Sequence, residues 1–378
     1  MYDKKSIELH KKYKGKLEIR SVIDIKDKEI LSLLYTPGVG AVSREIHSHP
    51  ETAYDYTIKG RTVAVVTDGS AVLGLGNIGP LAAMPVMEGK CALFKSFGNI
   101  DAVPICLNVH TPDEIINVIK AISPGFGGIN LEDIKAPECF IIEKALQDIG
   151  IPVMHDDQHG TAIVTLAALI NASKVIDKDI KDLKVIISGV GAAGVAIYRL
   201  LTNNRIGIQN IIMVDSKGIL SKERTDIDGY KKEIALNTNP LNIKGSMKDA
   251  LEGADVFIGV SAPNILTSDM INSMNEKKIV FAMANPDPEI SLENAKKLGI
   301  TVFATGRSDI PNQINNVLAF PGIFRGLLDN KINKITEDMK INASLKIADM
   351  IKTPGRENII PSVFNKDVVK EVASAFSK

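Results

Sequence analysis

Cysteine is scarce in this chain of 378 residues, which contains only Cys91, Cys106 and Cys139. The three cysteines are odd in number and far apart in the sequence. They therefore fit neither a disulfide framework nor a CxxC metal motif. We expect reduced thiols, most of them buried.

The sequence also lacks an excess of either charge, because 45 Lys and Arg residues balance 45 Asp and Glu residues. This balance does not indicate a nucleic-acid or anionic-membrane partner, so any electrostatic partner must be bound locally. No apolar run reaches the ~20 residues that cross a bilayer, and Met1 to Lys5 lack the apolar core of a secretory signal. We expect a cytoplasmic protein with no nucleic-acid or membrane partner.

The length predicts two domains rather than one core. The first 60 residues are polar with helical character, and Tyr35-Thr-Pro-Gly-Val-Gly40 predicts a loop that interrupts them. Apolar, β-branched runs then alternate with helix-like segments, which predicts strands at residues 62–67, 102–109, 126–131 and 151–155. A helix is predicted to open at Thr111, which has capping residues after it.

Two acidic pairs stand at the ends of predicted strands. Glu132 and Asp133 follow the strand at 126–131, and Asp156 and Asp157 follow the strand at 151–155. In open α/β sheets, ligands collect outside the carboxyl ends of the strands. Both pairs therefore fall where such a fold builds sites.

The second half contains a βαβ pattern. A strand at 184–188 leads into Gly189-Val-Gly-Ala-Ala-Gly194 and a helix, and the next strand, 210–214, ends at Asp215. Further strands are predicted at 254–260, 279–284 and 301–304. After Pro321 the chain is helical, with helical spacing over 332–351, and is expected to pack back on the first domain. The fold class is therefore α/β, with a catalytic domain at 1–160 and a doubly wound, Rossmann-type cofactor domain at 161–378.

The glycine loop predicts a dinucleotide site, because it lies between a strand and a helix. Its glycines let the backbone approach a pyrophosphate, and the helix N-terminus supplies N–H donors. The expected cofactor residues are Gly189, Val190, Gly191, Ala192 and Gly194. Asp215 would accept from a ribose hydroxyl, which favours NAD, whereas Lys217 could neutralise a 2′-phosphate and favours NADP. NAD and NADP both stay open.

The acidic residues Glu132, Asp133 and Asp157 could be solvated surface groups, but the apolar context around them suggests burial. Buried carboxylates without partners are costly, and Mg²⁺ or Mn²⁺ would remove that cost. His155 and His159 have the spacing of a zinc helix, yet the segment is turn-like and has no HExxH motif, which disfavours zinc.

Lys90 and Tyr35 are candidate acid–base groups. Lys90 lies in a mostly uncharged stretch, where desolvation could remove its proton and make it a base, although most lysines are solvated. Tyr35 precedes Thr-Pro-Gly and could donate a proton from a rigid loop, or it could simply pack on the turn.

Several motifs together resemble the malic enzymes in their short prokaryotic form, over residues 15 to 375. They are Tyr35-Thr-Pro-Gly-Val, Thr67-Asp-Gly-Ser-Ala-Val-Leu-Gly-Leu-Gly-Asn-Ile-Gly79, Glu88-Gly-Lys, Leu131-Glu-Asp133, His155-Asp-Asp-Gln-His-Gly-Thr-Ala162, Gly189-Val-Gly-Ala192 and Asn315-Asn-Val. The resemblance implies oxidative decarboxylation of L-malate to pyruvate and CO₂, with NAD or NADP and with Mg²⁺ or Mn²⁺. It also implies a homodimer.

The resemblance implies roles for individual residues as well. Glu132, Asp133 and Asp157 correspond to metal ligands, Lys90 to the general base and Tyr35 to the general acid. Asp156 would orient Lys90 or a metal-bound water. The resemblance further implies that Asn285 contacts the cofactor. It implies that the substrate is contacted by Lys90, Asn285 and Asn316.

One departure concerns the substrate carboxylate. Longer family members carry an arginine at the position of Ala71, and Arg307 or Lys95 are the candidates to replace it. Related activities also stay open: decarboxylation of oxaloacetate, conversion of malate to lactate, or an inactive nucleotide-sensing module. The presence of Tyr35, Lys90 and the three acidic ligands disfavours the inactive module.

Overall fold

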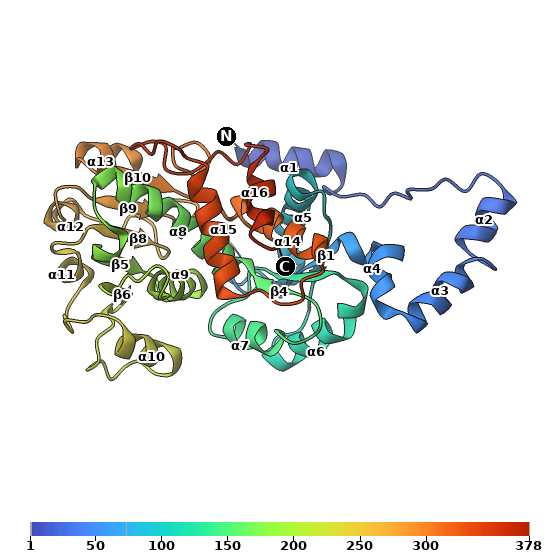
Figure 1. Ribbon diagram of the computed structural model, residues 1–378. Helices are drawn as coiled ribbons and strands as arrows, with labels where there is room; N and C mark the ends of the chain where they lie inside the picture. The colour runs from blue at the N-terminus through green and yellow to red at the C-terminus, as the bar shows by residue number, and fades with distance from the viewer. Residues whose placement is uncertain (1, 73, 378) are drawn as a thin grey trace.

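The computed structural model describes residues 2–72 and 74–377 and contains two sheets surrounded by helices (Figure 1). The first sheet has the strand order β2-β1-β3-β4, and its strands pair in parallel. These strands are β1 Thr62–Thr67, β2 Asp101–Cys106, β3 Gly128–Leu131 and β4 Val153–His155. Because the strands are parallel, the residues that follow β3 and β4 become neighbours at one edge of the sheet.

Helices cover both faces of the first sheet. Val63 and Val65 of β1 pack in the same core as Phe94, whereas Ala64 and Val66 pack in a second core with Ile115. This alternation is the period of a strand, and burial on both faces explains its continuous apolar run. The helices and 3-10 turns of this half are α1 Tyr2–Tyr13, α2 Lys28–Leu34, α3 Val39–Ser48, η1 Pro50–Thr52, α4 Ala53–Tyr56, η2 Ile58–Arg61, α5 Gly79–Gly98, α6 Pro112–Ile122, η3 Ser123–Gly125 and α7 Glu138–Ala145.

An N-terminal arm, residues 17–49, stands away from the rest of the molecule. It carries α2 and α3, which project to the right in Figure 1, far from both sheets. No residue of the arm is buried. Its position therefore does not come from packing against the body of its own chain.

The second sheet has the strand order β10-β9-β8-β5-β6-β7 and is parallel except for the β6–β7 pair. Helices flank this sheet as in a doubly wound fold, which confirms the predicted fold class. The strands are β5 Val185–Ser188, β6 Ile211–Asp215, β7 Gly218–Ile219, β8 Val256–Gly259, β9 Ile279–Ala282 and β10 Val302–Thr305. The helices are η4 Ile180–Asp182, α9 Ala192–Thr202, α10 Gly229–Asn237, α11 Met247–Leu251, α12 Ser268–Ser273 and α13 Leu292–Lys297.

One long helix, α8 Asp156–Ile176, follows the last strand of the first sheet and leads toward the second. By length and apolar composition α8 could cross a membrane, but 72% of its apolar window is buried inside the protein. It is the central core helix. The predicted domain boundary after residue 160 lies within it.

The C-terminal helices pack back on the first half, as the sequence predicts. They are η5 Asn316–Leu318, α14 Phe320–Asp329, α15 Glu337–Asp349 and α16 Val368–Ser374. The ring of Phe320 lies 4.6 Å from that of Phe94 on α5, and Asn171 of α8 donates to the carbonyl oxygens of Ala348 and Ile359. These contacts fix the C-terminal segment between the two sheets.

The sequence located the main strands, and the structure corrects details. The predicted helix at 332–351 begins only at Glu337, because the Thr336 side chain caps that end while Ile332 and Ile335 pack on the core in non-helical backbone. The short strand β7 was not predicted, because two residues carry no alternating pattern. The three cysteines are free, Cys91 and Cys139 are buried and Cys106 is half-buried, as expected.

Candidate active site

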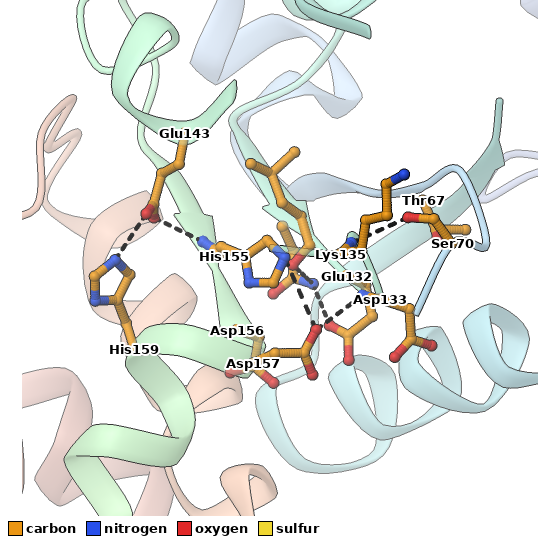
Figure 2. Close-up of polar contacts among 12 residues, drawn as sticks. Thr67, Ser70, Glu132, Asp133, Lys135, Glu143, His155, Asp156, Asp157 and His159 are labelled. Atoms are coloured by element: carbon orange, nitrogen blue, oxygen red, sulfur yellow. Dashed lines mark hydrogen bonds and ion pairs between the residues drawn. The ribbon is translucent and has the colours of Figure 1, made fainter. Parts of the chain in front are cut away.

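Three carboxylates meet at the carboxyl edge of the first sheet (Figure 2). Glu132 and Asp133 follow β3 directly, and Asp157 lies in the first turn of α8, after β4. One oxygen from each of the three lies within 4.8 Å of the others, and Oδ2 of Asp157 accepts from the backbone N–H of Asp133 at 2.8 Å. The predicted metal ligands are therefore neighbours, as two adjacent strand ends require.

Lys90 of α5 points into the same acidic group. Its Nζ lies 2.9 Å from Oε1 of Glu132 and 2.5 Å from Oδ2 of Asp156, and it also lies over the ring of Phe320, 4.2 Å from the centroid. Only 7% of the Lys90 side chain is exposed. The lysine is thus held in one position by two carboxylates and an aromatic face.

The protonation of Lys90 differs from the sequence expectation. Burial by itself lowers the pKa of Lys90, but the carboxylates of Asp156, Glu132 and Asp157 outweigh burial and raise it. The expectation that desolvation removes the proton of Lys90 is therefore wrong for this chain without a bound metal ion. The charged partners were invisible in the local sequence because they lie more than 40 residues away in the chain.

The acidic group has more negative charge than Lys90 can balance. Burial raises the pKa of Glu132 to about 7, of Asp156 to about 7 and of Asp157 to about 6, although the nearby Lys90 acts in the opposite direction. Buried carboxylates that hold protons this readily are suited to a hard divalent cation, which prefers oxygen ligands. The donor set therefore fits Mg²⁺ or Mn²⁺.

Asp156 links this group to the C-terminal half of the chain. Its Oδ2 accepts from Nδ2 of Asn316 at 2.5 Å, in addition to Lys90. Helix α8 brings Gly160 directly over the carboxylate, where a Cβ at residue 160 would lie 1.9 Å from Oδ1 of Asp156. Residue 160 must therefore be glycine for Asp156 to keep this position.

The glycine loop at Gly189–Gly194 joins β5 to α9. A Cβ at Gly194 would lie 1.9 Å from the carbonyl oxygen of Gly189, so this glycine permits close packing of the helix on the strand. A Cβ at Gly191 would meet nothing within 4 Å, so that position faces open space at the N-terminus of α9. The loop fits a dinucleotide pyrophosphate.

The loop lies beside the acidic group rather than apart from it. Ala192, the first residue of α9, packs against the core cluster that contains Leu131 and Ile134, on either side of Glu132 and Asp133. The glycine-rich turn after β1 also reaches the second sheet, since a Cβ at Gly74 would lie 2.5 Å from the carbonyl oxygen of Asn285. The predicted cofactor residues and the predicted metal ligands therefore lie beside one shared region.

Comparison with known proteins agrees with this arrangement. Residues 14–147 match the family model described as malic enzyme, N-terminal domain, and residues 158–378 match malic enzyme, NAD binding domain. The chain belongs to the malic enzyme family. This confirms the resemblance seen in the motifs, and with it the expectation of an NAD(P)-dependent malic enzyme.

Individual relatives among the malic enzymes cover nearly the whole chain. An NAD-dependent malic enzyme of Geobacillus stearothermophilus is 54% identical over 96% of this chain and 76% of its own length. A bifunctional malic/malolactic enzyme of Bacillus subtilis is 51% identical over 99% of this chain and 92% of its own. The crystal structure of an NAD-dependent malic enzyme from Thermotoga maritima aligns with a TM-score of 0.95 at 49% identity, over 98% of each chain.

Asp215, the predicted ribose acid of this malic enzyme, already has cationic partners. Its carboxylate accepts from Arg224 at 2.8 and 3.3 Å and lies 3.4 Å from Nζ of Lys231. Burial raises its pKa, but the hydrogen bonds from Arg224 and from the backbone N–H of Lys217 outweigh burial and lower it. The side chain of Lys217, predicted as a phosphate partner, instead pairs with Asp226.

The remaining substrate candidates lie at different places. Arg307 pairs with Asp309 and reaches the carbonyl oxygen of Pro286, next to Asn285. Lys95 pairs with Asp101 at the start of β2, which is the opposite edge of the sheet from the acidic group. The structure thus places Arg307 near the shared region and Lys95 away from it. Of the two candidates to replace the family arginine, the structure therefore favours Arg307, and its role stays a prediction.

Within one chain, Tyr35 does not lie near the other predicted catalytic residues. It ends α2 on the N-terminal arm, and 69% of its surface is exposed. In Figure 1 this helix lies far from α5, which carries Lys90. The loop expected at Tyr35 exists, but the tyrosine stands apart from the acidic group.

Sequence reasoning missed the polar groups that support the site. Nδ2 of Asn130 donates to Oε2 of Glu132 at 2.8 Å, from a buried position in β3. Glu143 of α7 accepts from the backbone N–H of His155 and contacts Nε2 of His159, both at 2.9 Å (Figure 2). An asparagine inside an apolar strand was a usable signal, whereas Glu143 had none in its local pattern.

Proposed function

We propose that this malic enzyme converts L-malate and NAD(P)⁺ to pyruvate, CO₂ and NAD(P)H. The observation that carries the proposal is the meeting of Glu132, Asp133 and Asp157 beside the buried Lys90, next to the glycine loop of the second sheet. Three oxygen ligands, one cationic side chain and a dinucleotide loop are the parts that a metal-assisted oxidation of a hydroxy acid requires.

The acidic residues hold the metal, and the loop Gly189–Gly194 with Asp215 and Asn285 holds the dinucleotide. When bound, the divalent ion supplies Lewis acidity toward the oxygen atoms of malate, and the nicotinamide supplies a hydride acceptor. Asn130 fixes the carboxylate of Glu132 through its 2.8 Å hydrogen bond. The backbone of Asp133 fixes that of Asp157 in the same way.

Lys90, oriented by Asp156, removes the proton of the malate 2-hydroxyl. Lys90 is oriented by Asp156 and by the face of Phe320, and Asp156 is itself oriented by Asn316. With a divalent ion balancing the charge of Glu132 and Asp157, Lys90 would lose the proton that these carboxylates stabilise, and the neutral amine then accepts the hydroxyl proton as hydride leaves C2. The carboxylate of Asp156 stabilises the ammonium group that results. Asn316 and Asn285 donate hydrogen bonds to the substrate.

Decarboxylation then requires a proton at C3. The bond from C3 to the distal carboxylate breaks, CO₂ leaves, and the electron pair forms the enolate of pyruvate. The resemblance assigns the donation of this proton, which completes the methyl group, to Tyr35, although Tyr35 lies apart from Lys90 within one chain. The number of protons balances, because the one taken from the hydroxyl equals the one returned to carbon.

Three further expectations belong to this proposal. The chain divides after residue 160 into a catalytic and a cofactor domain, with α8 shared between them. It acts as a homodimer, and it works in the cytoplasm. The small-molecule substrate is malate.

Product analysis tests the proposal. The purified protein with L-malate, Mn²⁺ and either NAD⁺ or NADP⁺ should release pyruvate and reduced nicotinamide in equal amounts. The likeness to a bifunctional malic/malolactic enzyme makes lactate formation without net cofactor reduction the second candidate. Lactate as sole product would replace the proposal with that activity. No turnover of malate under any of these conditions would reject both.

A further inference from the structure

A cavity lies beside the first turn of α8, separate from the acidic group. Its volume is about 340 Å³, and helices α7, α8, α9 and α15 all contribute residues to its wall. Small-molecule sites in proteins begin at roughly 300 Å³. Figure 2 shows two of the lining residues, Glu143 and His159, set apart from Glu132 and Asp133. The cavity is therefore large enough for a small ligand of its own.

The floor of the cavity, formed by its buried lining residues, carries a cation and an amide. Lys340 of α15 is 6% exposed, and its Nζ contacts the carboxylate of Glu337 and, at 3.2 Å, Nδ1 of His159. An ammonium group has three N–H donors, so one donor of Lys340 is left for a ligand. Gln158 of α8 lines the same cavity, is 2% exposed, and its Nε2 has no hydrogen-bond partner among the described residues. Buried donors without partners are rare and costly, so this floor is suited to an acceptor that is supplied from outside.

The two carboxylates in the lining do not block the approach of an anion. Glu143 is already engaged, because it accepts from the backbone N–H of His155 and contacts Nε2 of His159, both at 2.9 Å. Glu337 pairs with Lys340, but 58% of its side chain is exposed. The ion pair of an exposed glutamate contributes little, so Glu337 can be displaced at low cost.

The mouth of the cavity is cationic. Lys144 of α7 and Arg199 of α9 line it and are exposed, and within residues 2–72 and 74–377 neither side chain forms an ion pair with a carboxylate. The guanidinium of Arg199 lies 5.8 Å from the ring centroid of Phe140, which also lines the cavity. Unpaired positive charge at a concave surface raises the local concentration of anions. The mouth therefore favours a negatively charged ligand with a planar or apolar body.

We propose that this cavity is a second binding site, which takes a small organic carboxylate. The remaining donor of Lys340 and the amide of Gln158 bind the carboxylate oxygens. The body of the ligand packs against the apolar part of the lining, which includes Phe140, Met154 and Ile335. A neutral molecule would leave the charge of Lys340 unused, and an inorganic anion would leave the apolar wall uncovered.

The inference goes beyond the proposed function and does not depend on it. The residues that bind the carboxylate belong neither to the acidic group around Lys90 nor to the glycine loop of the second sheet. The ligand would contact α7 of the first half and α9 of the second half at once. Binding can therefore be measured without any turnover of malate.

A bromine-labelled carboxylate locates the site directly. Crystals of the whole chain soaked in para-bromobenzoate should show an anomalous bromine peak between α7, α9 and α15, with the carboxylate at Lys340. Peaks found only at the acidic group, or only on the outer surface, would overturn the proposal.

Calorimetry of the protein loaded with Mn²⁺ and NAD⁺ tests the class of ligand. Benzoate should bind at least about tenfold more tightly than benzyl alcohol, which lacks the charge, and than sulfate, which lacks the apolar body. Equal affinity for sulfate would mean a general anion site, and equal affinity for benzyl alcohol would mean an apolar pocket. Either result would overturn the assignment of a carboxylate.

Variants of the floor and of the mouth test the named residues. Lys340→Met should weaken benzoate binding about ten- to a hundredfold, the range expected for loss of a charged hydrogen bond. Lys346→Met, on the same helix α15 but outside the lining, is the matched control and should bind benzoate as the wild type does. Arg199→Gln changes an exposed residue, so it folds even if Lys340→Met does not, and it should weaken binding severalfold. Unchanged benzoate affinity in either folded variant would contradict the proposed site.

Discussion

The ammonium group of Lys90 lies 2.5 Å from Oδ2 of Asp156, and both side chains are buried. This pair joins α5 to the first turn of α8 and lies directly beside the predicted metal ligand Glu132. Asn316 contacts the same oxygen of Asp156 from the C-terminal half of the chain. The pair therefore connects the elements that form the site, and it carries the proposed acid–base chemistry.

Replacing Lys90 tests that chemistry. Lys90→Ala should lower kcat by about 10²- to 10⁴-fold, as for the loss of a general base. The dissociation constant of NAD(P)⁺ should stay nearly unchanged, because no contact of Lys90 reaches the glycine loop. Lys95→Ala, on the same helix but paired at the opposite edge of the sheet, is the matched control and should retain full activity. A Lys90→Ala variant with normal kcat would remove the lysine from the mechanism.

The glycine loop offers a matched pair of substitutions. Gly191→Ala should fold with an unchanged Tm, because its Cβ meets no atom, but it should raise KM for the cofactor about tenfold by keeping the pyrophosphate off the backbone. Gly194→Ala should instead lower stability by about 1–3 kcal/mol, because its Cβ would overlap the carbonyl oxygen of Gly189. Thermal unfolding and initial rates separate the two. If the two variants changed the Tm and the KM for the cofactor to the same extent, the result would contradict a pyrophosphate bound at Gly191.

Arg224 bears on the choice of cofactor. It pairs with Asp215 at the end of β6, where a 2′-phosphate of NADP would lie. Arg224→Ala should raise KM for NADP about ten- to a hundredfold, the range expected for loss of a charged hydrogen bond, and change KM for NAD much less. Arg205→Ala, which removes an exposed arginine that pairs with Asp338, is the control. If Arg224→Ala raised KM for NAD and for NADP equally, Arg224 would act only by holding Asp215 and not by contacting a 2′-phosphate.

Glu143 predicts an acid-dependent contribution to stability. Burial by itself raises its pKa, but His159 and the hydrogen bonds to His159 and the backbone of His155 outweigh burial and lower the pKa to about 2. A carboxylate with a lowered folded pKa stabilises above its unfolded value of 4.5, and this contribution is lost as the pH falls toward about 2. The difference in unfolding free energy between the wild type and Glu143→Gln should therefore shrink as the pH falls from 5 to about 2.

The control for that experiment is Glu337→Gln, an exposed glutamate near the same His159. It should show only a small difference at either pH, because an exposed ion pair contributes little. A Glu143→Gln difference that is independent of pH would mean that the carboxylate is not ionised at pH 5 in the folded protein.

The features that the sequence predicts best are those with a local pattern. The loop Gly189–Gly194 carries its strand, turn and helix within a short segment, and the proposed metal ligands Glu132, Asp133 and Asp157 lie in acidic pairs that follow apolar runs. The parallel topology then brings those strand ends together without further information. Both groups can therefore be predicted from the sequence alone.

The features that were missed depend on contacts between distant segments. Lys90 and Asp156 are 66 residues apart, so the local sequence suggested a desolvated neutral lysine where the fold provides a charged one. Phe320 reaches the site from the C-terminal half, and Arg224 reaches Asp215 from an irregular turn. Asn316 was expected at the substrate from the resemblance, but its contact with Asp156 was not. The position of Tyr35 depends on how the arm leaves the body, which no local pattern records.

The central claim is that Glu132, Asp133 and Asp157 together bind a divalent metal ion, and an ion bound there can be located directly. Crystals of the protein grown with Mn²⁺ and measured for anomalous scattering should show one strong peak within bonding distance of Glu132, Asp133 and Asp157, and EDTA should remove both the peak and the turnover of malate, with Mg²⁺ or Mn²⁺ restoring turnover. Full activity in excess EDTA, or a peak elsewhere with none between these three carboxylates, would contradict the account.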